Sequence, residues 1–225
     1  CSELGIDLTI KSIHPINEGF GIEANARDER YRVINESLSP NELLLTAHHK
    51  DDQLETILFR IFRGTGIDGL KGISHYMNNK GCTIFRPLLG YSRADLEDYA
   101  NENNIEWIED DSNKNISFDR NYIRNLLIPK IKNRWKNVEE STHRLSLIAV
   151  ENHQLLDEVA AEDLSQELDP NSITISCFDS HSLPRIKNMI RFLIEKNEMD
   201  MPSMHILNSG LDDLIKNDEK SAEIK

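Results

Sequence analysis

The stretch that decides the fold is LLLTAHHKDDQLETILFRIFR, residues 43–63. It opens with three leucines, a compact apolar run typical of a strand covered on both faces. Further along, apolar residues recur at the spacing of one helix face: Leu54, Ile57, Leu58, Ile61 and Phe62. The pattern predicts a buried strand that runs directly into an amphipathic helix.

Strand and helix patterns alternate on both sides of this stretch. The expected strands are 8–10, 43–45, 82–85 and 105–108, and the expected helices are 21–38, 50–63 and 93–103. Ser92 and Asp95 have the spacing of a capping box at the start of the last helix. This alternation predicts an α/β fold with a parallel sheet and helices on both faces.

The chain also shows a change of organisation along its length. We expect the α/β domain to cover residues 1–137 and a connecting helix to cover 138–169, where apolar residues keep helical spacing. Residues 170–225 are then expected to form a small, mainly helical domain. Because Cys1 to Ile6 reads like the last turn of a helix and Lys225 ends the chain without a capping signature, we expect the chain to be a fragment.

Composition excludes several classes of protein. With 38% hydrophobic and 29% charged residues, the chain can bury a core. No window approaches the ~18 apolar residues of a membrane helix and no signal segment opens the chain, so a cytoplasmic protein without a membrane partner is expected. Cys1, Cys82 and Cys177 are widely spaced, which predicts reduced thiols rather than disulfides or a Cys-rich zinc site.

The charge distribution is uneven. The net charge of −13 argues against bulk electrostatic binding of nucleic acid. From Lys114 to Arg144, however, eight Lys or Arg residues stand against three acids, a local charge of +5. This block either contacts a polyanion or solvates a helix face.

Two histidines and three carboxylates gather where the predicted strand meets the predicted helix: His48, His49, Asp51, Asp52 and Glu55. Carboxylates in a first helical turn are explained by capping and the helix dipole. Strand-to-helix junctions at the carboxyl edge of a parallel sheet are also where α/β folds bind ligands. Zinc at the two histidines is disfavoured, because adjacent residues rarely point at one ion.

Six short motifs occur in order over roughly residues 4–135. They are Gly21-Ile22-Glu23-Ala24 with Ala26-Arg27 and Arg30-Tyr31, His48-His49-x-Asp51-Asp52-Gln53-x-Glu55-Thr56, Arg63-Gly64-Thr65-Gly66-x-x-Gly69-Leu70, Arg86-Pro87-Leu88-Leu89, Trp107-x-Glu109-Asp110-Asp111-Ser112-Asn113 and Asp119-Arg120-Asn121-x-x-Arg124. Together they resemble the tRNA(Ile)-lysidine synthetase family, whose Ser-Gly-Gly-x-Asp-Ser phosphate loop is absent here. We expect the chain to lack that upstream loop and to be inactive alone.

The resemblance implies a carbon–nitrogen ligase of the N-type ATP-pyrophosphatase (PP-loop) group with an adenine nucleotide alpha hydrolase-like fold. Such an enzyme uses ATP, with magnesium, to adenylate the wobble cytidine of the CAU-anticodon tRNA(Ile). L-lysine then replaces AMP, and the resulting lysidine changes codon specificity from methionine to isoleucine. The resemblance also implies that residues 170–225 bind substrate or tRNA, and a homodimer is left open.

The resemblance also implies roles for individual residues. Asp52 and Glu55, one helical turn apart, are expected to bind the lysine ammonium. Arg63 and Asp52 are the expected catalytic residues. The other expected sites are ATP with magnesium at His49, Asp51 and Arg63, the metal itself at Asp51 and Asp52, and tRNA at Arg120, Arg124, Lys130 and Lys132. The arginines could equally form ion pairs on helix faces.

Two rival functions stay open at this point. A tRNA thiolase of the same superfamily would share the sheet and the His-Asp segment, but such enzymes generally need paired or catalytic cysteines, and Cys82 and Cys177 have no near partner in sequence. The other rival is an inactive tRNA-binding fragment.

Overall fold

The computed structural model describes residues 1, 4–13, 22–39, 41–79, 82–165, 173 and 180–216. The chain divides into two compact units, the first formed by residues 1–65 and 72–144 and the second by 66–71 and 145–225. The boundary falls inside the long helix α7, Val138–Leu164, which begins in the first unit and continues in the second. The division at 137 and 169 therefore stays a prediction.

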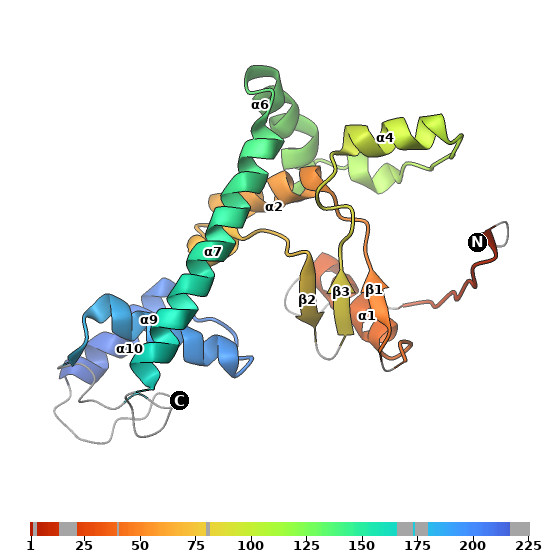
Figure 1. Cartoon of the computed structure of the whole chain (residues 1–225). Helices are drawn as coiled ribbons and strands as arrows, with labels where there is room; N and C mark the ends of the chain where they lie inside the picture. The colour runs from red at the N-terminus through yellow and green to blue at the C-terminus, as the bar shows by residue number, and fades with distance from the viewer. Residues whose placement is uncertain are drawn as a thin grey trace. The chain divides into compact units, whose positions relative to one another are not determined.

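The sheet of the first unit has three strands, β1 Leu43–Leu45, β2 Tyr76–Asn79 and β3 Cys82–Phe85. β3 lies in the middle, with β1 parallel to it and β2 antiparallel to it (Figure 1). The parallel pair was expected, but β2 was not. The expectation that β1 is buried on both faces is wrong, because Leu43 and Leu45 are 52% and 61% exposed. The sequence of β2, Tyr-Met-Asn-Asn, offers no apolar run, and ring stacking of Tyr76 on Phe85 at 4.5 Å secures it against β3.

Two predicted strands are absent from the described part of the chain. Residues 8–10 and 105–108 have no strand assignment, and side chains such as Leu8 and Ile108 are exposed. A strand is stabilised by ladder hydrogen bonds to a neighbour, and apolar alternation alone does not provide one. The expectation of a larger parallel sheet is wrong for these two segments of the described chain.

The helices of the first unit largely follow the predicted pattern. They are α1 Ile22–Asn35, α2 Lys50–Phe62, α4 Arg93–Glu102, the 3-10 turn η2 Asp111–Lys114, α5 Asp119–Tyr122, the π-helical turn η3 Ile123–Leu127 and α6 Ile128–Arg134. The capping box of α4 is confirmed, because the Asp95 N–H donates to Ser92 Oγ at 3.1 Å and the Ser92 N–H donates to Asp95 Oδ2 at 2.7 Å. Local sequence signals thus fix most helix starts.

A compact core holds α2 in place. Leu54, Ile123 and Ile128 are buried together, and they pack against Leu58, Phe59, Leu127 and Val138. The first part of the predicted apolar stripe, Leu54 and Leu58, therefore faces the η3–α6 segment, whereas its last two residues, Ile61 and Phe62, are exposed. This packing fixes where the polar first turn of α2 lies.

The second unit contains only helices in its described part, as expected for the carboxyl-terminal region. Besides the rest of α7 these are α3 Ile67–Leu70, α9 Leu183–Lys196 and α10 Met204–Lys216. Its core consists of Ala160, Leu164, Ile186, Met189, Leu207 and Leu211. No described helix of either unit is long and apolar enough to cross a membrane.

The α3 turn is fastened within this unit by charged groups. His153 on α7 lies 2.8 Å from Asp68 on α3, and its other ring nitrogen is 3.4 Å from both Asp157 and Glu195. Burial raises the pKa of Asp157, and the Glu195 and Asp68 carboxylates push it the same way while His153 opposes them. Residues 66–71, which contain α3, thus belong to the helical unit.

Shortening Leu54 should unfold the first unit more easily. The side chain is 1% exposed, so Leu54→Ala is expected to lower the free energy of unfolding by about 3 kcal/mol through lost burial and a cavity. Urea denaturation measures this. Ile61→Ala on the exposed side of the same helix is the control and should cost less than about 1 kcal/mol. Equal losses in the two variants would contradict the packing described here.

Candidate active site

The turn from β1 into α2 lies at the carboxyl edge of the parallel strand pair (Figure 1). The Thr46 N–H donates to the carbonyl of Phe85 at 3.1 Å, which extends the β1–β3 ladder by one bond. The Thr46 hydroxyl lies 2.9 Å from His48 Nδ1. The backbone of the turn is therefore fixed before the first polar side chains of α2 begin.

The carboxylates of the first helical turn do act as caps. Asp52 accepts the His49 N–H at 3.0 Å, and Asp51 accepts the Arg93 N–H of α4 at 2.7 Å. The capping interpretation is thus correct for Asp52 on α2, whereas Asp51 bonds to the first residue of the neighbouring helix α4. The second oxygen of each carboxylate is engaged by a cation from later in the chain.

Asp51 belongs to a three-membered charge cluster. The Lys132 ammonium of α6 bonds to Asp51 and lies 2.5 Å from Glu139 of α7. Burial alone would raise the pKa of Asp51, but the bonds from Lys132 and Arg93 outweigh it and lower the pKa. Burial would likewise lower the pKa of Lys132, and its two carboxylate partners raise it instead.

Glu55 is the most deeply buried charge of the site. Its side chain is 2% exposed, Arg124 Nε donates to one carboxylate oxygen at 2.6 Å, and Arg120 Nε lies 2.8 Å from the other. Arg124 also donates to Asp52 at 3.1 Å, and Arg120 donates to the Thr56 hydroxyl at 3.0 Å. Burial raises the pKa of Glu55, with Asp52 acting in the same sense and the two arginines against it.

These contacts bring together residues for which different roles were expected. Asp52 and Glu55 share one face, as the spacing predicted, but arginines occupy both in this structure. Arg120 and Arg124 are about one-third exposed and form the ion pairs that were the alternative to tRNA contacts. The lysine-binding and tRNA-binding roles of these four residues stay predictions.

Comparison with protein families matches residues 1–131 to the PP-loop domain. More than half of the chain lies in this match. The chain belongs to the PP-loop domain family.

Relatives of this PP-loop chain carry one name. It is 34% identical over 216 residues to the tRNA(Ile)-lysidine synthase of Haemophilus influenzae (strain 86-028NP), covering 96% of the chain and 50% of that protein. It is 38% identical over 205 residues to the tRNA(Ile)-lysidine synthase of Actinobacillus pleuropneumoniae serotype 3 (strain JL03), covering 90% and 49%. The chain spans about half the length of the curated relatives that it matches.

In this PP-loop chain, Arg63 lies far from the first turn of α2, where Asp52 is. It follows the last residue of that helix, about 16 Å along the axis from Asp52 at ~1.5 Å per residue. Its side chain is 65% exposed, lies over the Phe59 ring at 4.0 Å and is 3.6 Å from Asp119. The structure therefore does not place the expected catalytic pair, Arg63 and Asp52, around one reacting group.

The magnesium assignment can be checked against the donor set. Among the described residues no group of three or more His, Cys, Asp or Glu side chains could hold a metal ion. Asp51 and Asp52 face Lys132 and Arg124 instead of a shared empty position. Both carboxylates are thus paired with cations in this structure, and magnesium binding at Asp51 and Asp52 stays a prediction.

Two residues were not singled out for a site role, although both lie in the quoted motifs. Arg86 follows β3 directly, is 3% exposed and donates to the carbonyl of Ser74 at 2.7 Å. Burial lowers the pKa of His48, and the positive charges of Arg86, Arg27 and Arg120 add to this against the pull of Asp52. The carboxyl edge thus combines a neutral imidazole with positive potential that suits a phosphate group.

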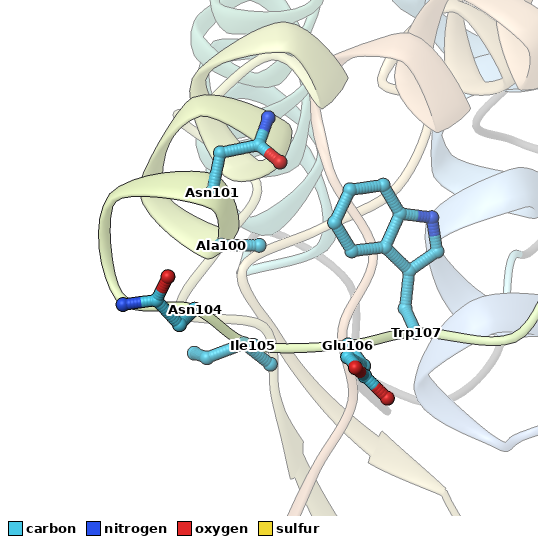
Figure 2. A pocket seen from close by; sticks show the side chains of 6 residues that line it. All are labelled: Ala100, Asn101, Asn104, Ile105, Glu106 and Trp107. Atoms are coloured by element: carbon cyan, nitrogen blue, oxygen red, sulfur yellow. The ribbon is translucent and has the colours of Figure 1, made fainter.

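The PP-loop unit also has a hollow of about 480 Å³ at the end of α4. Figure 2 shows the indole of Trp107 and the amide of Asn101 facing this hollow from its two sides. None of its lining residues is on α2: Ala100, Asn101, Asn104, Ile105, Glu106 and Trp107. It is separate from the carboxylate–arginine cluster.

Removing the Lys132 charge should give a pH-dependent loss of stability. Lys132→Gln is expected to lower the free energy of unfolding by about 1 kcal/mol at pH 7. Because the pKa of Asp51 is lowered in the fold, the stability from this pair is present above the unfolded pKa, about 4, and is lost as pH falls further. Denaturation midpoints of both proteins from pH 7 to pH 3 should therefore converge.

Lys130→Gln is the matched control, because Lys130 is exposed on the same helix. It should shift stability by no more than about 0.5 kcal/mol. A Lys132→Gln deficit that stays constant down to pH 3 would show that the Asp51 pair is not its cause.

Proposed function

We propose that this chain is the ATP-using part of a tRNA(Ile)-lysidine synthase. The observation that carries the proposal is the cluster of Asp52, Glu55, Arg120 and Arg124 at the carboxyl edge of a PP-loop domain. Relatives at 33–38% identity that carry this name support it. Alternating acids and arginines suit an amino-acid substrate better than a nucleotide alone.

The proposed reaction has two steps. The C2 oxygen of the wobble cytidine attacks the α-phosphate of ATP, an O–P bond forms, and pyrophosphate leaves. The side-chain amine of lysine then bonds to C2, the C2–O bond breaks, and AMP carries the oxygen away. Each step releases a stable leaving group, and no oxidant or reductant is needed.

The charge cluster can recognise the whole lysine molecule. Lysine is a zwitterion, so its ammonium groups need carboxylates while its carboxylate needs a cation. Asp52 is the more accessible acid and Arg124 the shared cation, whereas Glu55 is enclosed by both arginines. We therefore assign lysine contact to Asp52 and Arg124, and we assign to Glu55 the placement of both arginines. Direct contact of Glu55 with lysine stays a prediction.

His48 suits the proton transfer that the second step requires. The lysine ammonium must lose a proton before its nitrogen can attack C2. A lowered pKa keeps the His48 imidazole neutral near pH 7, where it can accept a proton. His49, Arg63 and magnesium stay predicted contributors to ATP binding, and Lys132 and Lys130 stay predicted tRNA contacts.

A thiolase function is less well supported. Cys82 is buried on β3, Cys1 is exposed, and Cys177 lies outside the described residues. No described cysteine lies among the residues of the charge cluster.

The proposal is tested with the intact gene product that contains this chain. ATP–pyrophosphate exchange should require tRNA(Ile), and radiolabelled lysine should become attached to that tRNA only when ATP is present. Incorporation of sulfur instead of lysine would replace the proposal by a thiolase. Absence of both activities would leave the inert tRNA-binding alternative.

Substitutions in the cluster should separate lysine binding from ATP binding. Asp52→Asn in the intact enzyme is expected to raise KM for lysine about tenfold or more while KM for ATP changes little, because the ammonium loses its anion. Glu55→Gln should raise KM for lysine as well and also destabilise the fold, because both arginines lose a partner. Asp98→Asn, at an exposed carboxylate of α4 with no assigned role, is the control and should leave both KM values unchanged. If both carboxylate variants keep the wild-type KM for lysine, these groups are structural caps and ion pairs only.

A further inference from the structure

The cations of the basic block, Lys114 to Arg144, differ in whether a carboxylate of the chain compensates their charge. Arg120, Arg124 and Lys132 form ion pairs with carboxylates of α2, so their charges are already compensated. Lys130, Arg134 and Lys136 are exposed, and no ion pair or hydrogen bond links their side chains to another residue in the described ranges. The uncompensated positive charge therefore lies at α6 and just beyond it.

These three cations lie close together at the carboxyl-terminal end of α6. Lys130 and Arg134 are four residues apart on α6, so they project from the same helix face. Lys136 lies two residues past the end of the helix. A cation in the last turn of a helix is also explained by the helix dipole. The dipole does not explain the exposed aromatic ring beside these cations.

That ring belongs to Trp135, which caps α6. Its N–H donates to Ile131 at 2.8 Å and its carbonyl accepts the Val138 N–H at 3.3 Å, so the backbone is held on both sides. The side chain is nevertheless 62% exposed, and the ring contacts identified within the described chain do not include it. A tryptophan fixed by its backbone and exposed at its ring is suited to stacking.

We propose that Lys130, Arg134, Trp135 and Lys136, the α6 end, form a binding surface for single-stranded RNA. The cations contact successive phosphates, and Trp135 stacks on an unpaired base between them. In an acidic chain of net charge −13 this local surface attracts a polyanion while the remainder repels it. The identification of the RNA as the tRNA anticodon loop rests on the proposed function.

Single-stranded RNA fits these observations better than an acidic protein surface or a duplex. An acidic protein patch would pair with the three cations but offers no flat partner for the indole. A duplex keeps its bases stacked inside and presents only phosphate and sugar to a helix end. An unpaired loop supplies both chemistries.

The first experiment measures the salt dependence of binding to an unmodified anticodon stem–loop RNA by the intact gene product. Lys130→Gln with Arg134→Gln should reduce the slope of log affinity against log salt by roughly one and a half units, about 0.7 per lost phosphate contact. The matched control is Lys11→Gln with Arg30→Gln, two exposed cations outside the basic block. The control should keep the wild-type slope, and equal slopes in all three proteins would overturn the proposal.

The second experiment uses the two tryptophans of the chain, Trp107 and Trp135. In Trp107→Phe, the fluorescence of Trp135 should be quenched by the stem–loop and not by a blunt RNA duplex. In Trp135→Phe, the remaining Trp107 should show little quenching, although it lines the separate hollow of Figure 2. The reverse pattern would place base stacking at Trp107 and overturn the assignment.

Trp135→Ala should weaken stem–loop binding about five- to hundredfold, with the salt slope unchanged, because stacking releases no counterions. These readouts require no turnover. If wild type lacks lysine ligation yet shows the quenching and slope changes, the proposed function fails and the RNA surface stands. If ligation is normal and both readouts match wild type in every variant, the RNA surface fails alone.

Discussion

The buried carboxylate of Glu55 is the constraint on which the first unit depends. A carboxylate that is 2% exposed must have cationic partners, since an uncompensated buried charge costs several kcal/mol. Arg120 and Arg124 supply them from α5 and η3. The apolar packing of Leu54 against Ile123 and Ile128 brings the same segments together, so charge pairing and core packing specify one arrangement.

Local patterns in the sequence predicted the elements that depend on neighbours in the chain. The apolar run and helical stripe of residues 43–63 predicted β1 and α2, and Ser92 with Asp95 predicted the start of α4. β2 was missed because its stability comes from pairing with β3 and from the Tyr76–Phe85 stack. Residues 105–108 show the converse, an apolar alternation that finds no ladder partner within the described chain.

The candidate site was predictable in part for the same reason. Asp52 and Glu55 share a face because helical periodicity is a local property. Arg124, which pairs with both, is 72 residues from Asp52 and 69 residues from Glu55 in sequence. No spacing rule indicates such a pairing. Arg63 was chosen as a cation for the α-phosphate of ATP, but the length of α2 separates it from Asp52.

Capping of a helix occupies only one oxygen of a carboxylate and leaves the other for a second contact. Asp52 uses one oxygen on the His49 N–H and the other on Arg124, so the helix end orients the very oxygen that faces the charge cluster. The same distinction applies to the basic block, whose net charge in sequence overstates what is available to a polyanion. Cations that pair with carboxylates inside the fold position the site. In the described part of the chain, only the unpaired cations at the α6 end can attract a polyanion. A count of residues cannot separate these two groups, because the separation is made by tertiary contacts.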